Sequence, residues 1–531
     1  MWYLAIVVAA TIVLYYELYI AGAVSPSIIA GTGMTFPFYV YISVVGNAVG
    51  AFGSLAAGLS DRWGRANLVA YGLLVTGVLV LVGIPNVSGK WGFAILFCVI
   101  GLVEGVILVA TPALIRDFSP QLGRASAMGF WTLGPVIGSL VVAIVSSNTV
   151  NHLGAWQDQF IICGIVGVVV GIVALFGLKE LSPRLRDQLM VSIRDRALIE
   201  ARARGLDVRE SLRNPWRQML HLDVIGSAFA ISVFLLIYYT AVGFFTVYFT
   251  TLHGFSLSKA NSIGDWFWAF DAIGLIVVGV ISDRLRVRKP FMVIGAVGGI
   301  VMTIVFLNLG PNTSYSTFAV VISILAVFLA IAYAPWMASF TETVERRNPA
   351  LIATGLAVWG WIIRVVIAVS VLVLPTVVSS MTPLVTYGGQ VSTLSAQYAP
   401  QLATLAAIDP RTQAALQATP PSAAAQVTAV GEIAKAFSVT PAAATTRLVA
   451  LSKVPQADLL FLGQHGTDVQ KAAAAAPGQW RNWWWVCVGG EVVFIPFVLL
   501  MAGRWRPRKA REDAEEHERK VQEELGALEK A

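Results

Sequence analysis

Charged side chains are scarce in this chain of 531 residues. Asp, Glu, Lys and Arg make up only 13% of the sequence, whereas 57% of the residues are hydrophobic and the mean hydropathy is +0.73. Soluble domains carry about twice that share of charge. The composition therefore excludes an ordinary soluble protein and predicts an all-α membrane protein.

Reactive side chains are also few. The three cysteines, Cys98, Cys163 and Cys487, all lie in apolar runs, and none of the five histidines clearly does. This distribution speaks against a disulfide, a metal site or a histidine proton relay. No metal-ligand cluster, nucleophile-base pair or phosphate-binding loop is visible, so we expect neither enzyme activity nor a cofactor.

Long apolar runs dominate what is present. A helix needs roughly 17 to 25 residues to cross a bilayer, and twelve runs reach that length. We place them near 2–23, 38–60, 67–85, 91–115, 126–147, 159–178, 224–250, 261–281, 290–309, 317–341, 350–376 and 482–503.

Three landmarks occur twice along the chain. Tyr15-Tyr16, Asp61-Arg62 and Pro112 reappear as Tyr238-Tyr239, Asp283-Arg284 and Pro335, at offsets of 223, 222 and 223 residues. One six-helix unit is therefore repeated, which predicts two pseudo-symmetric six-helix bundles. In membranes such duplication is typical of transporters with a site between the halves.

The distribution of Lys and Arg predicts the orientation. With a cytoplasmic N-terminus, the inner loops hold twenty basic residues, whereas the short outer loops hold only Lys90 and Lys259. Basic loops stay in the cytoplasm, so both termini are expected inside a multi-pass protein of the inner or plasma membrane. The net charge of +7 reflects this bias rather than nucleic-acid binding.

Composition shifts divide the chain further. The charged stretch after the sixth run reads as a cytoplasmic linker with surface helices, and the Ala- and Thr-rich insertion reads as an extracytoplasmic helical cap or a flexible spacer. The expected domains are the first bundle 1–178, the linker 179–221, helices seven to eleven 222–376, the insertion 377–480, helix twelve 481–503 and a charged cytoplasmic tail 504–531.

A loop motif carries a family resemblance. The chain reads Ala57-Gly58-Leu59-Ser60-Asp61-Arg62-Trp63-Gly64-Arg65 at the end of the second run. This stretch resembles the major facilitator superfamily, whose pattern between helices two and three is G-x-L-x-D-R-x-G-R, although Ala57 replaces the first Gly. The resemblance implies the fold of that superfamily, a monomer, and a gate in which Asp61, Arg62, Gly64 and Arg65 latch the two halves.

A second, weaker copy supports the resemblance. Gly279-Val280-Ile281-Ser282-Asp283-Arg284 keeps the leading Gly, and Asp283 and Arg284 complete the candidate gate. On the fifth run, Gly134-Pro135 and Gly138 resemble the core of the superfamily's antiporter motif, although Phe130 replaces its usual Gly. Pro112 and Pro335 are expected to kink their helices.

Arg364 lies at the middle of the eleventh run. An arginine at mid-bilayer costs roughly 2.5 to 3.5 kcal/mol, so a partner is expected. The partner is either a substrate carboxylate or Asp271 on the eighth run, and the two can exchange. The resemblance extends to the oxalate/formate antiporter group, which has basic groups on helices eight and eleven. Asp271 on helix eight favours a monocarboxylate instead.

Three acids and several aromatic residues complete the candidate site. Glu104, Asp271 and Glu17 are candidate proton carriers, with Glu17 nearest to an end of its run and open to water there; Asp265 is expected at an entrance. In the superfamily helices one and seven face the cavity, so Tyr15, Tyr16, Tyr238 and Tyr239 are candidate substrate-binding aromatics, and the eighth run adds Trp268. One tyrosine of each adjacent pair is expected to pack ordinarily, because neighbours on a helix point about 100° apart.

These features predict a secondary transporter that works by alternating access. Its partners are the lipid bilayer and a small-molecule substrate, expected to be an anion carried by proton symport or anion exchange. Two alternatives remain open: a proton-coupled drug efflux antiporter, and a transporter-like sensor that uses the insertion 377–480.

Overall fold

The computed structural model describes most of the chain. The described residues are 2–55, 64–118, 133–179, 215–348, 351–417, 422–509, 511–512, 515–516, 519–520 and 523. They form helices and loops without a strand, and they fall into two compact units. The bundle unit comprises Met1–Val378 and Gly478–Ala531, and the insertion unit comprises Ser379–Pro477.

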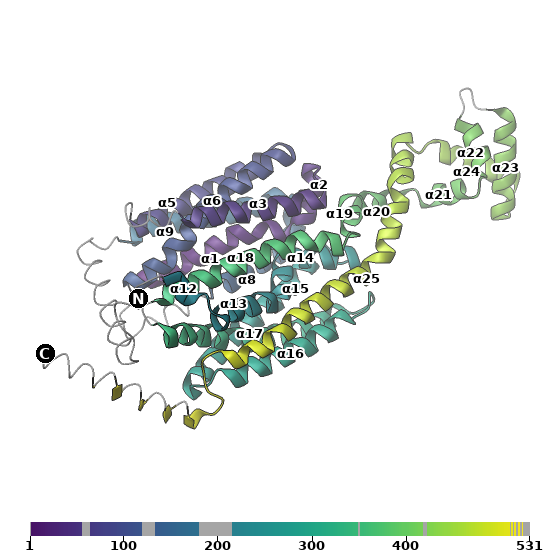
Figure 1. The fold of residues 1–531 in the computed structure, drawn as a ribbon. Coiled ribbons are helices and arrows are strands. Elements are labelled where there is room, and N and C mark those ends of the chain that lie inside the picture. Colours follow the sequence, from purple (N-terminus) through teal and green to yellow (C-terminus); the bar gives the residue numbers. More distant parts are fainter. Residues whose placement is uncertain are drawn as a thin grey trace. The chain divides into compact units, whose positions relative to one another are not determined.

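The first half of the bundle unit runs from α1 to α9 (Figure 1). Every backbone N–H in a bilayer needs an internal partner, so these apolar segments fold as helices. Their bounds are α1 Trp2–Ala23, α2 Ser25–Thr32, α3 Phe36–Leu55, α5 Arg65–Val78, η1 Leu79–Gly83, η2 Ile84–Asn86, α6 Gly89–Phe118, α8 Gly134–Leu153 and α9 Trp156–Gly177.

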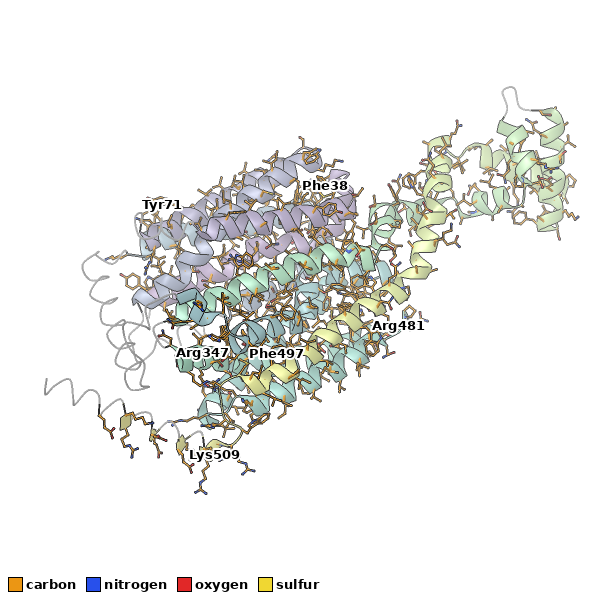
Figure 2. All side chains as sticks on the ribbon, in the orientation of Figure 1. Phe38, Tyr71, Arg347, Arg481, Phe497 and Lys509 are labelled. Carbon is orange, nitrogen blue, oxygen red and sulfur yellow. The ribbon has the colours of Figure 1, made fainter. Side chains whose placement is uncertain are left out.

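The second half of the bundle unit runs from α12 to α18 and ends with α25. The bounds are α12 Pro215–Met219, α13 Leu222–Phe234, α14 Leu236–Leu252, α15 Leu257–Leu285, α16 Lys289–Leu307, α17 Tyr315–Arg347, α18 Ile352–Val377 and α25 Gln456–Leu500. Figure 2 shows Arg347 where α17 ends; its guanidinium donates to both oxygens of Asp223 on α13, at 2.9 Å each.

Twelve segments in the described residues are long and apolar enough to cross a membrane, which confirms the predicted number. Two differ from the predicted helices. The seventh is divided at Leu235 into α13 and α14, because Leu235 has φ −84° and ψ 12°, outside the helical range. The twelfth is the end of α25, which begins at Gln456 rather than near 482 because the Ala-rich residues before it continue the helix.

The insertion unit is helical and has its own apolar core. It contains α19 Met381–Thr386, α20 Gly388–Gln397, α21 Ala399–Ala406, α22 Pro410–Gln417, α23 Ala423–Phe437 and α24 Pro441–Ser452. Ile408, Ala429, Ile433, Ala444 and Leu451 pack together, with exposed fractions of 8% or less. This arrangement fits the helical cap better than the flexible spacer, since a spacer has no core.

Candidate functional site

Five tyrosines gather at the interface between the two halves. Tyr15 and Tyr19 of α1, Tyr238 and Tyr239 of α14, and Tyr333 of α17 are half-buried and lie within electrostatic range of one another. We call these five residues the tyrosine group. The rings of Tyr15 and Tyr19 are 5.5 Å apart, and those of Tyr238 and Tyr239 are 5.7 Å apart.

Trp268 extends this aromatic surface. Its ring is 5% exposed and meets the Tyr238 ring edge-on at 5.0 Å. The aromatic faces and hydroxyls can hold a solute that has both a flat apolar part and polar groups.

Arg364 lies midway along α18 and faces the tyrosine group. Its guanidinium is half-buried and within electrostatic range of Tyr15, which belongs to the opposite half. Trp361, three residues earlier on α18, is 71% exposed, so only part of this helix surface faces the interior of the bundle unit. Among the described residues no ion pair joins Arg364 to Asp271, so the expected internal partner does not hold this arginine.

Two buried acids approach the tyrosine group from opposite halves. Glu104 of α6 is 4% exposed and lies within range of Tyr19, and Asp271 of α15 is 3% exposed and lies within range of Tyr238 and Tyr333. Oε1 of Glu104 has no hydrogen-bond partner in the described part of the chain. An unpaired carboxyl group at this depth is suited to bind a proton or a cationic group.

Tyr16 and Glu17 point away from the tyrosine group. Tyr16 is 1% exposed and faces Cys163 of α9, as expected for the packing member of its pair. Both Tyr238 and Tyr239 face the centre, so that expectation fails for the second pair. The expectation of water around Glu17 is wrong, because this side chain is 4% exposed and accepts a hydrogen bond from Thr76 Oγ1 at 2.9 Å.

The candidate gate is described only in part. Asp61 and Arg62 lie outside the described residues. Gly64 precedes α5 with φ 90°, a conformation that favours glycine, and Arg65 begins that helix half-buried. In the second copy Asp283 pairs with Arg288 at 2.6 Å, and Arg284 is exposed.

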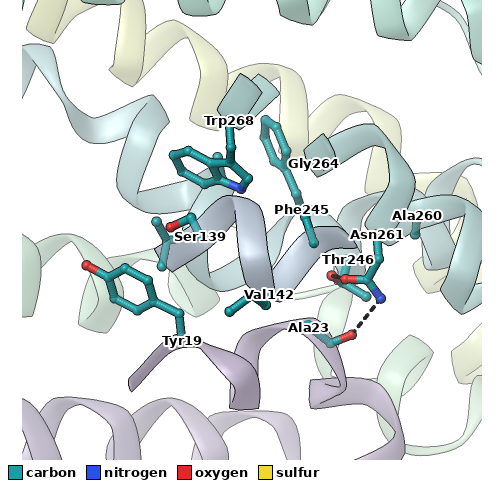
Figure 3. Close-up of a pocket in the computed structure, with 13 residues that line it drawn as sticks. Tyr19, Ala23, Ser139, Val142, Phe245, Thr246, Ala260, Asn261, Gly264 and Trp268 are labelled. Atoms are coloured by element: carbon teal, nitrogen blue, oxygen red, sulfur yellow. Dashed lines mark hydrogen bonds between the residues drawn. The ribbon is translucent and has the colours of Figure 1, made fainter. Parts of the chain in front are cut away.

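Polar contacts join the halves at the ends of α1, α8 and α15. Asn261 Nδ2 donates to the carbonyl oxygen of Ala23 at 3.0 Å, and Ser147 Oγ donates to Asp265 Oδ2 at 3.0 Å. Asp265, the expected entrance residue, therefore links α15 to α8. A cavity of about 40 Å³ lies beside Asn261, Ser139 and Trp268 (Figure 3), enough for one or two waters.

One residue of the candidate site and one further buried acid were not predicted from the sequence. Tyr333 lies two residues before the duplicated Pro335, and this position beside a repeated landmark could have identified it. Glu491 of α25 is fully buried and lies within the predicted twelfth run, so its charge alone could have identified it. In the described residues no three His, Cys, Asp or Glu side chains gather as metal ligands.

Comparisons with known proteins agree on one class. A family model described as Major Facilitator Superfamily matches residues 7–371. The chain is 24% identical over 263 residues to "Probable anion transporter 3, chloroplastic" of Oryza sativa subsp. japonica, and 22% identical over 286 residues to "Probable galactarate/D-glucarate transporter GudP" of Escherichia coli (strain K12). It is 25% identical over 313 residues to an "MFS-type efflux pump" of Mycolicibacterium smegmatis.

These alignments are partial. They cover 46%, 51% and 56% of this chain and 49%, 62% and 63% of the three relatives, so the match spans about half to two thirds of their length. Among solved structures, a bacterial homologue of the human lysosomal transporter Spinster, inward-facing and occupied, gives a TM-score of 0.54 at 13% identity, covering 94% of this chain and 95% of that one. A D-xylose-proton symporter gives 0.51 at 14% identity, covering 70% and 96%. These likenesses show a shared fold.

Proposed function

The chain belongs to the major facilitator superfamily, a family of membrane transporters rather than enzymes, and on that premise we propose that it carries a small, monocarboxylate-like organic anion by alternating access. Arg364 is the observation that carries this proposal. A guanidinium midway along a membrane helix, with no ion pair to an acid in the described residues, is stabilised when a substrate carboxylate binds it.

The substrate is proposed to lie between Arg364 and the tyrosine group. Tyr15 lies within electrostatic range of the guanidinium, and Trp268 and Tyr238 supply apolar surface from the second half. Relatives named for anion and for galactarate/D-glucarate transport support an anionic substrate. One mid-membrane cation favours one carboxylate over two.

Proton symport or anion exchange supplies the driving force in this proposal. Glu104 and Asp271 are the proposed proton carriers, because both are buried and both lie within range of the tyrosine group. Glu17 is a poorer candidate for substrate coupling, since its carboxyl group faces Thr76 instead. Protonation of either central acid would remove a negative charge that opposes anion binding.

The gate and the orientation are proposed from the sequence pattern. Asp61, Arg62, Gly64 and Arg65, with Asp283 and Arg284 in the second copy, are the proposed latch between the halves. The bias of basic residues supports cytoplasmic termini in a cell membrane, with the insertion unit outside.

Drug efflux is the second candidate. A relative named as an efflux pump and the buried Glu104 and Asp271 favour it, because buried acids beside aromatic rings can bind a lipophilic cation. Deleting the insertion unit addresses the sensor alternative: solute flux that persists after deletion rules out sensing as the main activity.

Flux through proteoliposomes tests the proposal. We expect Arg364→Ala to lower carboxylate flux by roughly 10- to 150-fold, the equivalent of the 1.5 to 3 kcal/mol of a charged hydrogen bond. Arg364→Lys should recover only part of the flux, because lysine cannot bind a carboxylate through two nitrogens in one plane. Arg481→Ala is the matched control, since this arginine is exposed. Unchanged carboxylate flux in Arg364→Ala, or export of a lipophilic cation alone, would contradict the anion proposal.

A further inference from the structure

One buried carboxyl group of the bundle unit has no part in the proposed substrate site, and no ion pair joins it to a cation among the described residues. Glu491 of α25 is 0% exposed, and its Oε1 accepts a hydrogen bond from Thr303 Oγ1 of α16 at 2.8 Å. Its Oε2 has no hydrogen-bond partner among the described residues. Threonine is therefore the only described side chain that hydrogen-bonds this carboxyl group.

Glu17 repeats this arrangement in the first half. Its Oε2 accepts from Thr76 Oγ1 of α5 at 2.9 Å, and its Oε1 has no partner in the described part. Thr76 and Thr303 both come from the third membrane helix of their half. Each half thus holds a buried glutamate that has one oxygen bonded to a threonine and one oxygen without a hydrogen-bond partner among the described residues.

The two glutamates come from different helices of the repeat. Trp156 and Cys163 of α9 match Trp480 and Cys487 of α25, both at an offset of 324. In this alignment of the repeats Gly167 is equivalent to Glu491. The tyrosine pairs align at an offset of 223, which makes Glu17 equivalent to Thr240.

The absence of a side chain on Gly167 explains how the glutamate can come from α1 in the first half and from α25 in the second. A Cβ on Gly167 would overlap Oε1 of Glu17, so the carboxyl group from α1 fills the space that a side chain on α9 would take. In the second half the side chain at the matching position is Glu491 itself. The same location therefore receives a carboxyl group in both halves.

The surroundings of both carboxyl groups favour the protonated form. Among the described residues, the titratable groups within range of Glu17 are Glu104 of α6 and Cys163 of α9, and the one near Glu491 is Cys487 of its own helix. None is a cation. An ionised carboxylate without a counter-ion in an apolar interior is strongly unfavourable, whereas a neutral acid needs only hydrogen bonds.

We propose that Glu17 and Glu491 form a matched pair of proton-binding sites, one in each half and both outside the substrate site. Each carboxyl group holds a proton at neutral pH and ties the third helix of its half to α1 or α25. The pair needs no substrate, so its test is independent of the proposed function.

Infrared spectroscopy of the purified full chain tests the protonation. We expect Glu17→Gln and Glu491→Gln each to remove intensity from the carbonyl stretch of protonated carboxylic acids at neutral pH. Glu342→Gln is the matched control, because Glu342 is 39% exposed and pairs with Arg288 at 3.1 Å, so it should leave that band unchanged. If the band is intact in both Gln variants, the carboxyl groups are ionised and the proposal is overturned. Glutamine keeps the shape of the side chain, which favours a folded variant.

Moving the carboxyl group tests the shared location. The double variant Glu17→Thr with Gly167→Glu copies the second half into the first. We expect each single substitution to lower the melting temperature and the double variant to recover at least half of the combined loss. Combining Glu17→Thr with Gly171→Glu, one turn further along α9, should give no recovery. Equal losses in the two double variants would contradict a common location.

Discussion

The two halves of the bundle unit repeat one helix pattern but pack equivalent helices differently. In the first half α3 and α6 meet through backbone, because a Cβ on Gly105 would overlap the carbonyl oxygen of Gly50. The equivalent helices of the second half, α15 and α17, meet where a Cβ on Gly274 would lie 2.8 Å from Ala330 Cβ. The duplication thus preserves the order of the helices while the contacts between them have diverged, so each half can be perturbed separately.

The backbone contact of the first half should be the more sensitive. We expect Gly105→Ala to lower stability by about 3 kcal/mol, the upper part of the range for overpacking, because a carbonyl group in a helix cannot move aside as a side chain can. Thermal unfolding in detergent measures the change. Gly279→Ala is the control in the second half, since nothing lies within 4 Å of the added Cβ. Equal losses in the two variants would contradict this account of the contact.

The second-largest effect is expected at the hydrogen bonds of Asn261, which link the two halves. Asn261 binds Ala23 of the first half and accepts from Thr246 of its own half at 3.3 Å. Replacing it with Ala leaves a buried carbonyl group unpaired, at a cost of roughly 1 to 3 kcal/mol in the state seen here. We expect Asn261→Ala to raise the population of conformations in which the two halves separate at this contact by roughly 5- to 150-fold.

Cysteine labelling measures that opening. Ala143→Cys, in a chain with the three native cysteines replaced by Ala, places a thiol in the wall of the small cavity. Asn261→Ala should speed its reaction with a membrane-impermeant maleimide. Ser262→Ala is the matched control, because Ser262 bonds only within the second half, to Lys259 and Tyr315. Faster labelling in both variants would point to general loosening instead.

The sequence predicts the shared features of the halves better than their differences. Apolar length and the repeated landmarks predicted twelve spans, because a segment that crosses a bilayer satisfies all its backbone hydrogen bonds internally when it forms a helix. The break at Leu235 was not predictable, since no Pro or Gly marks it.

The candidate site was predicted where a single residue is unusual by itself. Arg364 and the tyrosine pairs are conspicuous in an apolar run. The orientation of Tyr16 and Glu17 towards α9 and α5 depends on tertiary contacts, which spacing along one helix does not give. Glu491 could have been found from its charge within an apolar run, but its bond to Thr303, 188 residues away, could not, because that contact depends on tertiary packing.

The pH dependence of stability should distinguish the second half, which has a histidine in its aromatic cluster, from the first. His253 follows α14 among aromatic rings, with the Phe318 ring at 4.6 Å, and burial lowers its pKa. The unfolded chain then takes up the proton more readily, so stability should fall as the pH drops below about 6.5. The aromatic cluster of the first half, around Phe93 and Trp156, contains no histidine among its described contacts. Melting temperatures at about pH 8 and pH 5 should therefore converge in His253→Phe but stay apart in His152→Phe, since His152 is exposed.

The smallest effect is expected at Arg286, in the turn that carries the second copy of the loop motif. Gly64 has φ 90°, and the residue at the matching position, Arg286, has φ 54° and ψ 29°. Both turns need a positive φ, but only the first copy has the glycine that adopts it without strain. We expect Arg286→Gly to stabilise the protein by roughly 0.5 to 1 kcal/mol, since relief of strain exceeds the added freedom of the unfolded chain. Gly64→Ala should destabilise it by about 1 to 3 kcal/mol.

Arg284→Gly is the control, because Arg284 lies within α15, where glycine should cost about 1 kcal/mol. A loss of stability in Arg286→Gly equal to that of Arg284→Gly would show that the arginine side chain, rather than the backbone, determines this turn.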